Sequence, residues 1–211
     1  MAKVSGLISA SLSGNLDGLV FVKMNGKTYV RTMPDKRNAN SWSEKQTAAR
    51  SSFRFVILYA KRQKELVIKP IWNKPAKELN MNGFNLFVKT NRAAFDSLGK
   101  VIDPGLLHFS TGQLPLSYLF RAEVDIENPK SIAVTWTDPL VNKQYNDDCL
   151  MAVTYQDGPS DPFNTGYTRK DLQARIPNHY SSIKDVYLYL FFWNQKLDIY
   201  SPDHVIIIKH T

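Results

Sequence analysis

Chemistry-bearing residues are sparse in this 211-residue chain, and the most suggestive motif is a Gly-Lys-Thr triplet. Gly26-Lys27-Thr28 resembles the end of a phosphate-binding loop, which also needs a glycine five positions earlier and a helix afterwards. Phe21 stands where that glycine would be, and β-forming residues follow the triplet. The single cysteine, Cys149, opens an apolar run, where a small buried side chain is expected rather than a nucleophile. Neither feature predicts a catalytic site.

Candidate metal ligands are also few. The histidines are His108, His179, His204 and His210. No two of them have the four-residue spacing of a helical metal motif, so only a non-local cluster could hold zinc. Asp138, Asp147 and Asp148 flank one expected loop and would suit calcium, but their spacing is not that of an EF-hand. We therefore predict no metal, no cofactor and no enzymatic activity.

Positive charge is concentrated in the first half of the chain. Residues 1–100 hold 18 Lys+Arg against 6 Asp+Glu, whereas residues 101–211 hold 9 against 13. Summed positive charge attracts nucleic acid, anionic lipid or an acidic protein, although a solvated helix face has the same composition. The candidate polyanion-binding residues are Lys23, Lys27, Arg31, Lys36, Arg37, Arg50 and Arg54. Four of them, Lys27, Arg31, Arg50 and Arg54, are expected to form part of one continuous positive surface.

A β-hairpin is expected over residues 18–33, where two β-forming runs flank Asn25-Gly26. The Asn-Gly pair favours a type I′ turn, because that turn requires a positive φ at both central residues. Pro34 should end the second strand, because proline cannot donate a hydrogen bond within a sheet. The hairpin would carry Lys23, Lys27 and Arg31 of the candidate polyanion-binding residues.

Two helices are expected to follow the hairpin. The first begins at Ser43, because Ser43 and Gln46 have the spacing of a capping box, and Ser41 with Glu44 offers an alternative register. Its expected buried stripe consists of Ala49, Phe53, Val56, Ile57, Ala60 and Val67. Pro70 should end this helix at or before Lys69, because a residue that precedes proline avoids the helical conformation. The second helix is expected over Asn82–Leu98, and the glycine after it suits a helix C-cap.

From about residue 105 the pattern changes to short β-forming runs separated by turn residues. The expected strands are Leu106–Ser110, Leu119–Glu127, Ser131–Thr137, Cys149–Gln156, Tyr167–Arg175, Asp185–Trp193 and Val205–Lys209. Such strands without intervening helices are typical of an antiparallel sandwich of the fibronectin-III or immunoglobulin type. The predicted fold class is α+β. A basic module of a β-hairpin and helices occupies residues 1–104, and an acidic seven-stranded β-sandwich occupies residues 105–211.

The run Val186–Trp193 is apolar on both faces, as expected of a strand that is covered on both sides. One face would point into the sandwich. The other face presents Tyr187, Tyr189, Phe191 and Trp193. Exposed apolar patches are rare on monomers, so these four side chains are expected to form an interface. The cover could be the first helix, a second copy of the chain or a different protein.

Several segments resemble an uncharacterised bacterial family of about this length. Its members share a glycine-punctuated β start that ends in a Lys-x-Tyr-x-Arg strand, here Lys27, Tyr29 and Arg31, and a helix cap follows, here at Ser43. Residues 110–115, 134–138 and 186–192 are similar to its later blocks. The loop after residue 138 departs from the family, whose members have a Gly- and Ser-rich loop there. The resemblance implies a two-part layout with a C-terminal β-sandwich and no established activity.

The leading function hypothesis is a non-enzymatic binding or structural protein whose sandwich binds a protein partner or a second copy. Nucleic-acid binding through the basic module is the alternative, and a carbohydrate-binding or hydrolytic enzyme is the third hypothesis. The longest apolar runs, Phe55–Ala60 and Val186–Trp193, are far shorter than the roughly 20 residues that cross a bilayer, so no membrane partner is expected. The first residues lack the apolar stretch of a secretion signal, so the expected compartment is the cytoplasm.

Overall fold

The computed structural model describes residues 2–4, 13–24, 26–35, 42–125, 128, 130–138, 143–178 and 184–209. The chain divides into two compact units, Met1–Gln46 and Thr47–Thr211. Its described residues form helices and three antiparallel sheets, so the fold is α+β as predicted. The predicted boundary between residues 104 and 105 falls inside the second unit, because the helices pack on the C-terminal strands.

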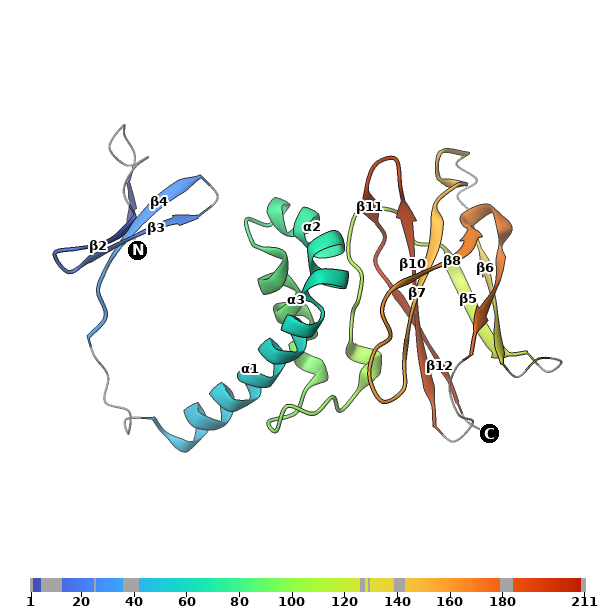
Figure 1. Cartoon of the computed structure of the whole chain (residues 1–211), viewed down its shortest axis with the longest axis horizontal. Helices are drawn as coiled ribbons and strands as arrows, with labels where there is room; N and C mark the ends of the chain where they lie inside the picture. The colour runs from blue at the N-terminus through green and yellow to red at the C-terminus, as the bar shows by residue number, and fades with distance from the viewer. Residues whose placement is uncertain are drawn as a thin grey trace. The chain divides into compact units, whose positions relative to one another are not determined.

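In the described part of the first unit, four strands form an antiparallel sheet (Figure 1). Its strands are β1 (Ala2–Val4), β2 (Gly14–Leu16), β3 (Leu19–Met24) and β4 (Lys27–Thr32), in the order β1-β4-β3-β2. β3 and β4 pair along their whole length, which confirms the predicted hairpin. Gly26 has a φ of +73°, the left-handed conformation that the turn needs, and Asn25 lies outside the described residues.

Helix α1 (Glu44–Arg62) begins with the predicted capping box. The backbone N–H of Ser43 donates to Oε1 of Gln46 at 3.0 Å, and the N–H of Gln46 donates to Oγ of Ser43 at 3.3 Å. These bonds satisfy two N–H groups that have no partner within the first turn. Only one side of α1 is buried, where Val56 and Ala60 have no exposed surface.

Helix α1 ends at Arg62, before Lys69 as predicted, but the chain remains helical through Pro70, which the sequence did not predict. A π-helical segment (Lys64–Trp72) and helix α2 (Asn73–Glu78) carry the chain past the proline. The π-helical segment opens with a hydrogen bond from the N–H of Ile68 to the carbonyl of Gln63, five residues earlier. In an α-helix, a proline ring clashes with the carbonyl four residues before it, and the wider turn of a π-helix relaxes this clash.

Helix α3 (Gly83–Asn91) and a 3-10 turn (Arg92–Ala94) take the place of the single helix predicted over Asn82–Leu98. Asn82 caps the start of α3, because its side chain accepts from the N–H of Asn85 at 2.7 Å. Gly99 is not a helix cap. It lies in a separate turn, with a φ of +81°.

Eight strands follow in the described part of the chain, and they form two antiparallel sheets. Their bounds are β5 (Tyr118–Val124), β6 (Ser131–Thr137), β7 (Cys149–Tyr155), β8 (Phe163–Thr168), β9 (Gln173–Pro177), β10 (Val186–Asn194), β11 (Ile199–Tyr200) and β12 (His204–Ile208). One sheet has the order β5-β6-β9. The other has the order β11-β10-β7-β8, and β12 also pairs with β10.

Two of the predicted strands differ from the structure. Residues 106–110 form no strand, because a 3-10 turn (Pro104–Leu106) leads into an irregular segment between the helices and the sheet. The predicted strand Tyr167–Arg175 is two strands, β8 and β9. A 3-10 turn (Arg169–Asp171) and Leu172, whose φ is +57°, separate them. This turn takes the chain from one sheet to the other and places Arg169 in the interior.

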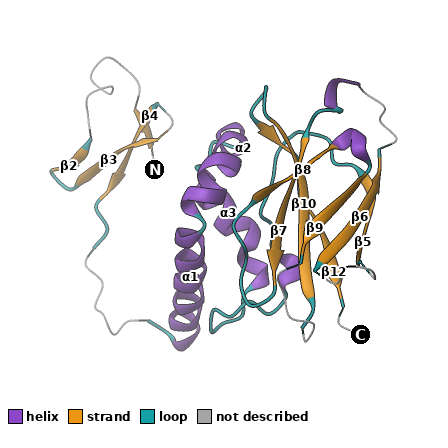
Figure 2. Cartoon of the chain, turned by 45° about the vertical axis from the view of Figure 1, so that its right-hand side comes forward, coloured by secondary structure: helices purple, strands orange, loops and turns teal. Residues whose placement is uncertain are grey.

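Two buried apolar clusters give the second unit three layers (Figure 2). One cluster lies between the two sheets and includes Trp136 of β6 and Leu190 of β10. The other lies between the helices and the opposite face of β7 and β10, and includes Trp72, Phe87 and Tyr189. β10 is therefore covered on both faces, as its sequence predicted. Because the helices and the sheets share a core, they belong to one unit.

Candidate functional site

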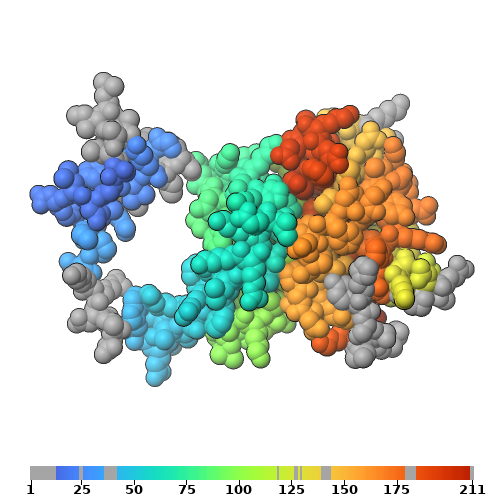
Figure 3. Space-filling view, viewed as in Figure 1, coloured from blue at the N-terminus to red at the C-terminus, as the bar shows by residue number. Residues whose placement is uncertain are grey.

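The chain's own helices cover the aromatic face of β10. Tyr189 and Phe191 have no exposed surface and belong to the cluster that the helices share with the sheet. Tyr187 is half-buried, and Trp193 stacks on Tyr200 with ring centroids 5.9 Å apart. Figure 3 shows the helical segment (cyan to green) directly against the strands (orange to red). Tyr189 and Phe191 are therefore not available to another molecule. Of the three covers that the sequence left open, the first helix, with its neighbours, is the one that the structure shows.

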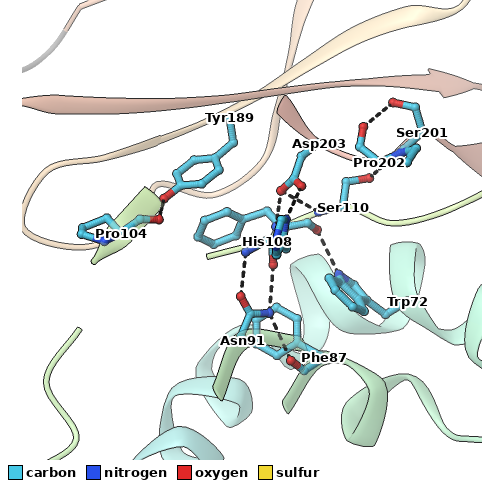
Figure 4. A network of polar contacts seen from close by, with 11 residues as sticks. Trp72, Phe87, Asn91, Pro104, His108, Ser110, Tyr189, Ser201, Pro202 and Asp203 are labelled. Atoms are coloured by element: carbon cyan, nitrogen blue, oxygen red, sulfur yellow. Dashed lines mark hydrogen bonds and ion pairs between the residues drawn. The ribbon is translucent and has the colours of Figure 1, made fainter. Parts of the chain in front are cut away.

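A polar network fastens residues 108–110 to the sheet (Figure 4). These residues belong to the irregular segment that runs from the helices to β5. The side chain of Asp203 is 2% exposed, and its Oδ2 accepts from the N–H of Phe109 at 2.5 Å and of Ser110 at 3.2 Å. Its Oδ1 lies 2.9 Å from Nδ1 of His108. This hydrogen bond raises the pKa of His108, and partial burial of the imidazole opposes the rise. One carboxylate thus holds three consecutive residues.

The helices hold the same segment from the other side. The buried amide of Asn91 accepts from the N–H of His108 at 2.6 Å and donates to the carbonyl of His108 at 3.0 Å. Nε1 of Trp72 donates to the carbonyl of Phe109 at 3.0 Å. We call Trp72, Asn91, His108 and Asp203 the Asp203 clamp. Its bonds join the helices, the crossing segment and the sheet, so its role is structural.

A second buried polar cluster surrounds Arg169. Nη1 of Arg169 lies 3.1 Å from Oδ2 of Asp138, and Nη2 lies 3.3 Å from Oδ2 of Asp148. Burial raises the pKa of Asp148, and its hydrogen bonds, including one from Arg169, oppose the rise. Two of the carboxylates considered as calcium ligands are thus paired with an arginine. The third, Asp147, is exposed and pairs with Lys170 at 2.9 Å.

The remaining chemical candidates lie apart from one another. Cys149 is half-buried at the start of β7. His204 stacks on Phe120, and burial lowers its pKa. His179 and His210 lie outside the described residues. Across the residues whose positions are described, no three His, Cys, Asp or Glu side chains come together as a metal site requires.

The basic residues of the first unit do not share one face of its sheet. Successive side chains of a strand point to opposite faces, so Lys27, Tyr29 and Arg31 of β4 lie on one face. Lys23 pairs with Thr28 and therefore lies on the other face of the sheet. The Gly-Lys-Thr triplet leads into strand β4, not into a helix. Lys36 and Arg37 fall outside the described residues.

Three of the five basic residues of α1 form a stripe on its exposed side. At about 100° per residue, Arg50, Arg54 and Lys61 lie within about 40° of one another around the helix axis. All three are exposed, and they lie about 120° from the buried side chains of Val56 and Ala60. Arg50 and Arg54 belong to the predicted polyanion-binding set, and Lys61 extends it. We call these three residues the α1 stripe.

An exposed aromatic ring adjoins the α1 stripe. The sequence places Phe53 in the buried stripe of this helix, but the structure leaves it 42% exposed. The guanidinium of Arg92, in the turn after α3, lies 5.7 Å from the centroid of the Phe53 ring. An open hollow on α1 is lined by Thr47, Arg50, Ser51, Phe53 and Arg54. Helical spacing alone could not reveal this exposure, because the packing of α3 decides how far the buried side of α1 extends.

Comparisons with known proteins assign no family. The sequence matches no protein-family model, and a search of curated proteins found no match. The resemblance to an uncharacterised bacterial family therefore stays a prediction. Among the helices in the described ranges, none is long and apolar enough to span a membrane.

Proposed function

We propose that the protein is a non-enzymatic binding protein that holds a nucleic acid through the exposed side of α1. The observation that carries this proposal is the α1 stripe, which places Arg50, Arg54 and Lys61 on one side of a helix whose only acidic residue is Glu44. A row of cations attracts the phosphate backbone, and guanidinium groups bind phosphate oxygens with two parallel hydrogen bonds. The two buried polar clusters support the non-enzymatic part of the proposal, because their side chains bond to the fold itself.

Fluorescence anisotropy with a labelled oligonucleotide at two salt concentrations tests this function. The triple variant Arg50→Gln, Arg54→Gln, Lys61→Gln should bind at least about tenfold more weakly and respond less to salt, because fewer phosphate contacts release fewer counterions. The matched control removes the same charge from exposed lysines of the second unit: Lys130→Gln, Lys196→Gln and Lys209→Gln. It should bind like the wild type. Absence of binding by the wild type at low salt, or equal losses in both variants, would overturn the proposal.

We also propose that the two C-terminal sheets form a seven-stranded sandwich of the fibronectin-III type. Apart from the two-residue β11, the strands follow the chain in the order β5, β6, β7, β8, β9, β10 and β12. The sheet orders β5-β6-β9 and β8-β7-β10-β12 support the proposal, because that fold groups its first, second and fifth strands in one sheet. An experimental structure in which β9 pairs with β7 instead of β6 would contradict it.

Protein binding through this sandwich is the second candidate function, and a hollow beside β6 and β9 favours it. Thr135, Gln173 and Arg175, together with Tyr167 of β8, contribute to the lining of a hollow of about 310 Å³. This volume is at the lower end of the range for ligand pockets, so it suits one anchoring side chain of a partner. Tyr167→Ala should then abolish a pull-down interaction that Thr137→Ala, at an exposed position of β6, leaves intact. An interaction that survives Tyr167→Ala would exclude this hollow.

A further inference from the structure

The geometry around Phe53 points to single-stranded nucleic acid as the ligand of the α1 stripe, an inference that rests on the function proposed above. A duplex hides the faces of its bases, whereas a single strand can stack them on an aromatic ring. Phe53 is 42% exposed and adjoins the stripe, because it lies one helical turn after Arg50 and lines one hollow together with Arg50 and Arg54. The helix therefore offers a stacking ring beside a row of phosphate-binding groups.

Arginines border this ring from two elements of the second unit. The Arg92 guanidinium lies 5.7 Å from the ring centroid, and Arg50 and Arg54 share the hollow on α1 with Phe53. A base that covers the exposed part of the ring removes apolar surface from water, and the neighbouring guanidinium groups can hold the flanking phosphates. Stacking of one base on one aromatic ring is worth about 5- to 150-fold in affinity.

The length of the stripe fits a short stretch of one strand. Arg50 and Lys61 are separated by about 16 Å along the helix axis, at about 1.5 Å per residue. At about 3.4 Å per nucleotide of a stacked strand, this distance corresponds to about five nucleotides. Single-strand binding sites of this size are common, because one domain typically contacts about 4–16 nucleotides. An oligothymidylate of about 12 nucleotides is therefore a sufficient probe and has little structure of its own.

Phe55 supplies a matched control on the same helix. It is 41% exposed, nearly the same fraction as Phe53. At about 100° per residue, its side chain lies on the other side of the helix, about 160° from Phe53. There it lies against the turn at Gly99, where an added Cβ would be 2.1 Å from Cγ of Phe55. Replacing either phenylalanine by leucine keeps an apolar side chain and removes one exposed ring.

The test compares the full-length wild type with Phe53→Leu and Phe55→Leu by fluorescence anisotropy. The probes are a labelled oligothymidylate and a duplex, each of about 12 nucleotides or base pairs. Phe53→Leu should weaken binding of the oligothymidylate at least about fivefold and change duplex binding less than about twofold. Phe55→Leu should leave both affinities unchanged. Thermal unfolding of each variant shows whether it is folded, and Phe53→Trp provides a second readout, because its fluorescence should be quenched when a base stacks on the indole.

The outcomes separate this inference from the function on which it rests. If the wild type binds neither probe, nucleic-acid binding itself is excluded. A second outcome is that the wild type binds and the triple variant at Arg50, Arg54 and Lys61 loses binding, whereas Phe53→Leu binds the oligothymidylate normally. This result would support nucleic-acid binding by the α1 stripe and overturn the stacking of a single strand on Phe53. A wild type that binds the duplex more tightly than the oligothymidylate overturns the inference as well.

Discussion

Arg169 illustrates how strongly one buried charge depends on its partners. Its side chain is 3% exposed and lies 4.1 Å from the centroid of the Phe192 ring, in a place where water cannot replace a lost ion pair. Asp138 and Asp148 neutralise it from two sides. The backbone is fixed too, because Nε1 of Trp136 donates to the Arg169 carbonyl at 3.1 Å. Removing the guanidinium would leave two carboxylates in the interior.

Arg169→Met should therefore lower the free energy of unfolding by about 3–5 kcal/mol, as measured by urea denaturation. Lys170→Met is the matched control. Both side chains of its ion pair with Asp147 are more than half exposed, so its loss should stay below about 1 kcal/mol. Replacing Asp138 and Asp148 by asparagine in the Arg169→Met background should restore part of the stability. A loss below about 1 kcal/mol for Arg169→Met alone would contradict the structural role of this cluster.

His108 should contribute stability that is lost as the pH rises. Its hydrogen bond to Asp203 raises the pKa of His108 in the folded protein above the unfolded value of about 6.5. The protonated ring therefore stabilises the fold below the unfolded pKa, and this contribution disappears as the pH rises through the folded pKa. The imidazole is 47% exposed, so solvent screening keeps the effect below about 1 kcal/mol.

Comparing the unfolding free energies of the wild type and His108→Gln at about pH 5.5 and about pH 8.5 isolates this contribution. The substitution should cost more at the lower pH. Burial lowers the pKa of His204 and gives the opposite dependence, but His204 is present in both proteins and largely cancels from the difference. Equal costs at both pH values would show that the ion pair with Asp203 does not stabilise the fold.

At the scale of elements, Gly99 allows the chain segment around it, a turn separate from the 3-10 turn of Arg92, to approach α1 closely. Its φ is +81°, and an added Cβ would lie 2.1 Å from Cγ and 2.2 Å from Cβ of Phe55. Gly99→Ala should lower the free energy of unfolding by about 2–4 kcal/mol, because a strained φ adds to overpacking. Gly158→Ala is the control, because a Cβ there would meet nothing within 4 Å. If both variants unfold at the same urea concentration, this close approach is absent in solution.

Elements with local signals could be predicted from the sequence, and elements held by distant contacts could not. The capping box of α1 and the Asn-Gly hairpin depend on neighbouring residues. The passage through Pro70 depends on the burial of Ile71 and Trp72, which offsets a local cost that the sequence alone shows. The sequence did not show the division of the predicted strand at Arg169 for a similar reason. The turn places Arg169 in the interior beside Asp138 and Asp148, and arginine is rarely buried.

The candidate site was predictable only in part for the same physical reason. Arg50 and Arg54 could be singled out, because cations in a helix with one acidic residue are expected on its exposed side. Phe53 could not, because its helical spacing matches the buried side chains and only the position of α3 leaves it exposed. Lys23 was grouped with Lys27 and Arg31, and the strand register separates them.

At the scale of the whole molecule, the second unit should fold without the first. Both buried apolar clusters formed by described residues belong to the second unit. In the first unit, Leu16, Val22 and Met33 are 61%, 37% and 56% exposed. A fragment of residues 42–211, which keeps the capping box of α1, should unfold within about 2 °C of the full chain in scanning calorimetry. A midpoint lower by more than about 10 °C would show that the first unit stabilises the core of the second.

The boundary between the units was misplaced for a reason visible in β10. Its two apolar faces showed that something must cover the strand, and the change in composition near residue 105 suggested separate domains. Composition reports what each segment is made of, whereas domain membership depends on which segments share a core. Tyr189 and Phe191 join the helices to the sheet, so the helices belong with the strands.

The Asp203 clamp also determines the order in which the protein can be completed during translation. Helices α1 to α3 leave the ribosome before the strands of the second unit, and their local hydrogen bonds can form there. Asp203, which fastens the segment from His108 to Ser110, emerges more than 90 residues later than that segment. Until β10 and Asp203 follow, the nascent helices expose the apolar side that the sheet will cover. A ribosome stalled before β10 would therefore carry a helical intermediate with exposed apolar side chains. Chaperones should recognise this form of the protein, because they bind exposed apolar surface.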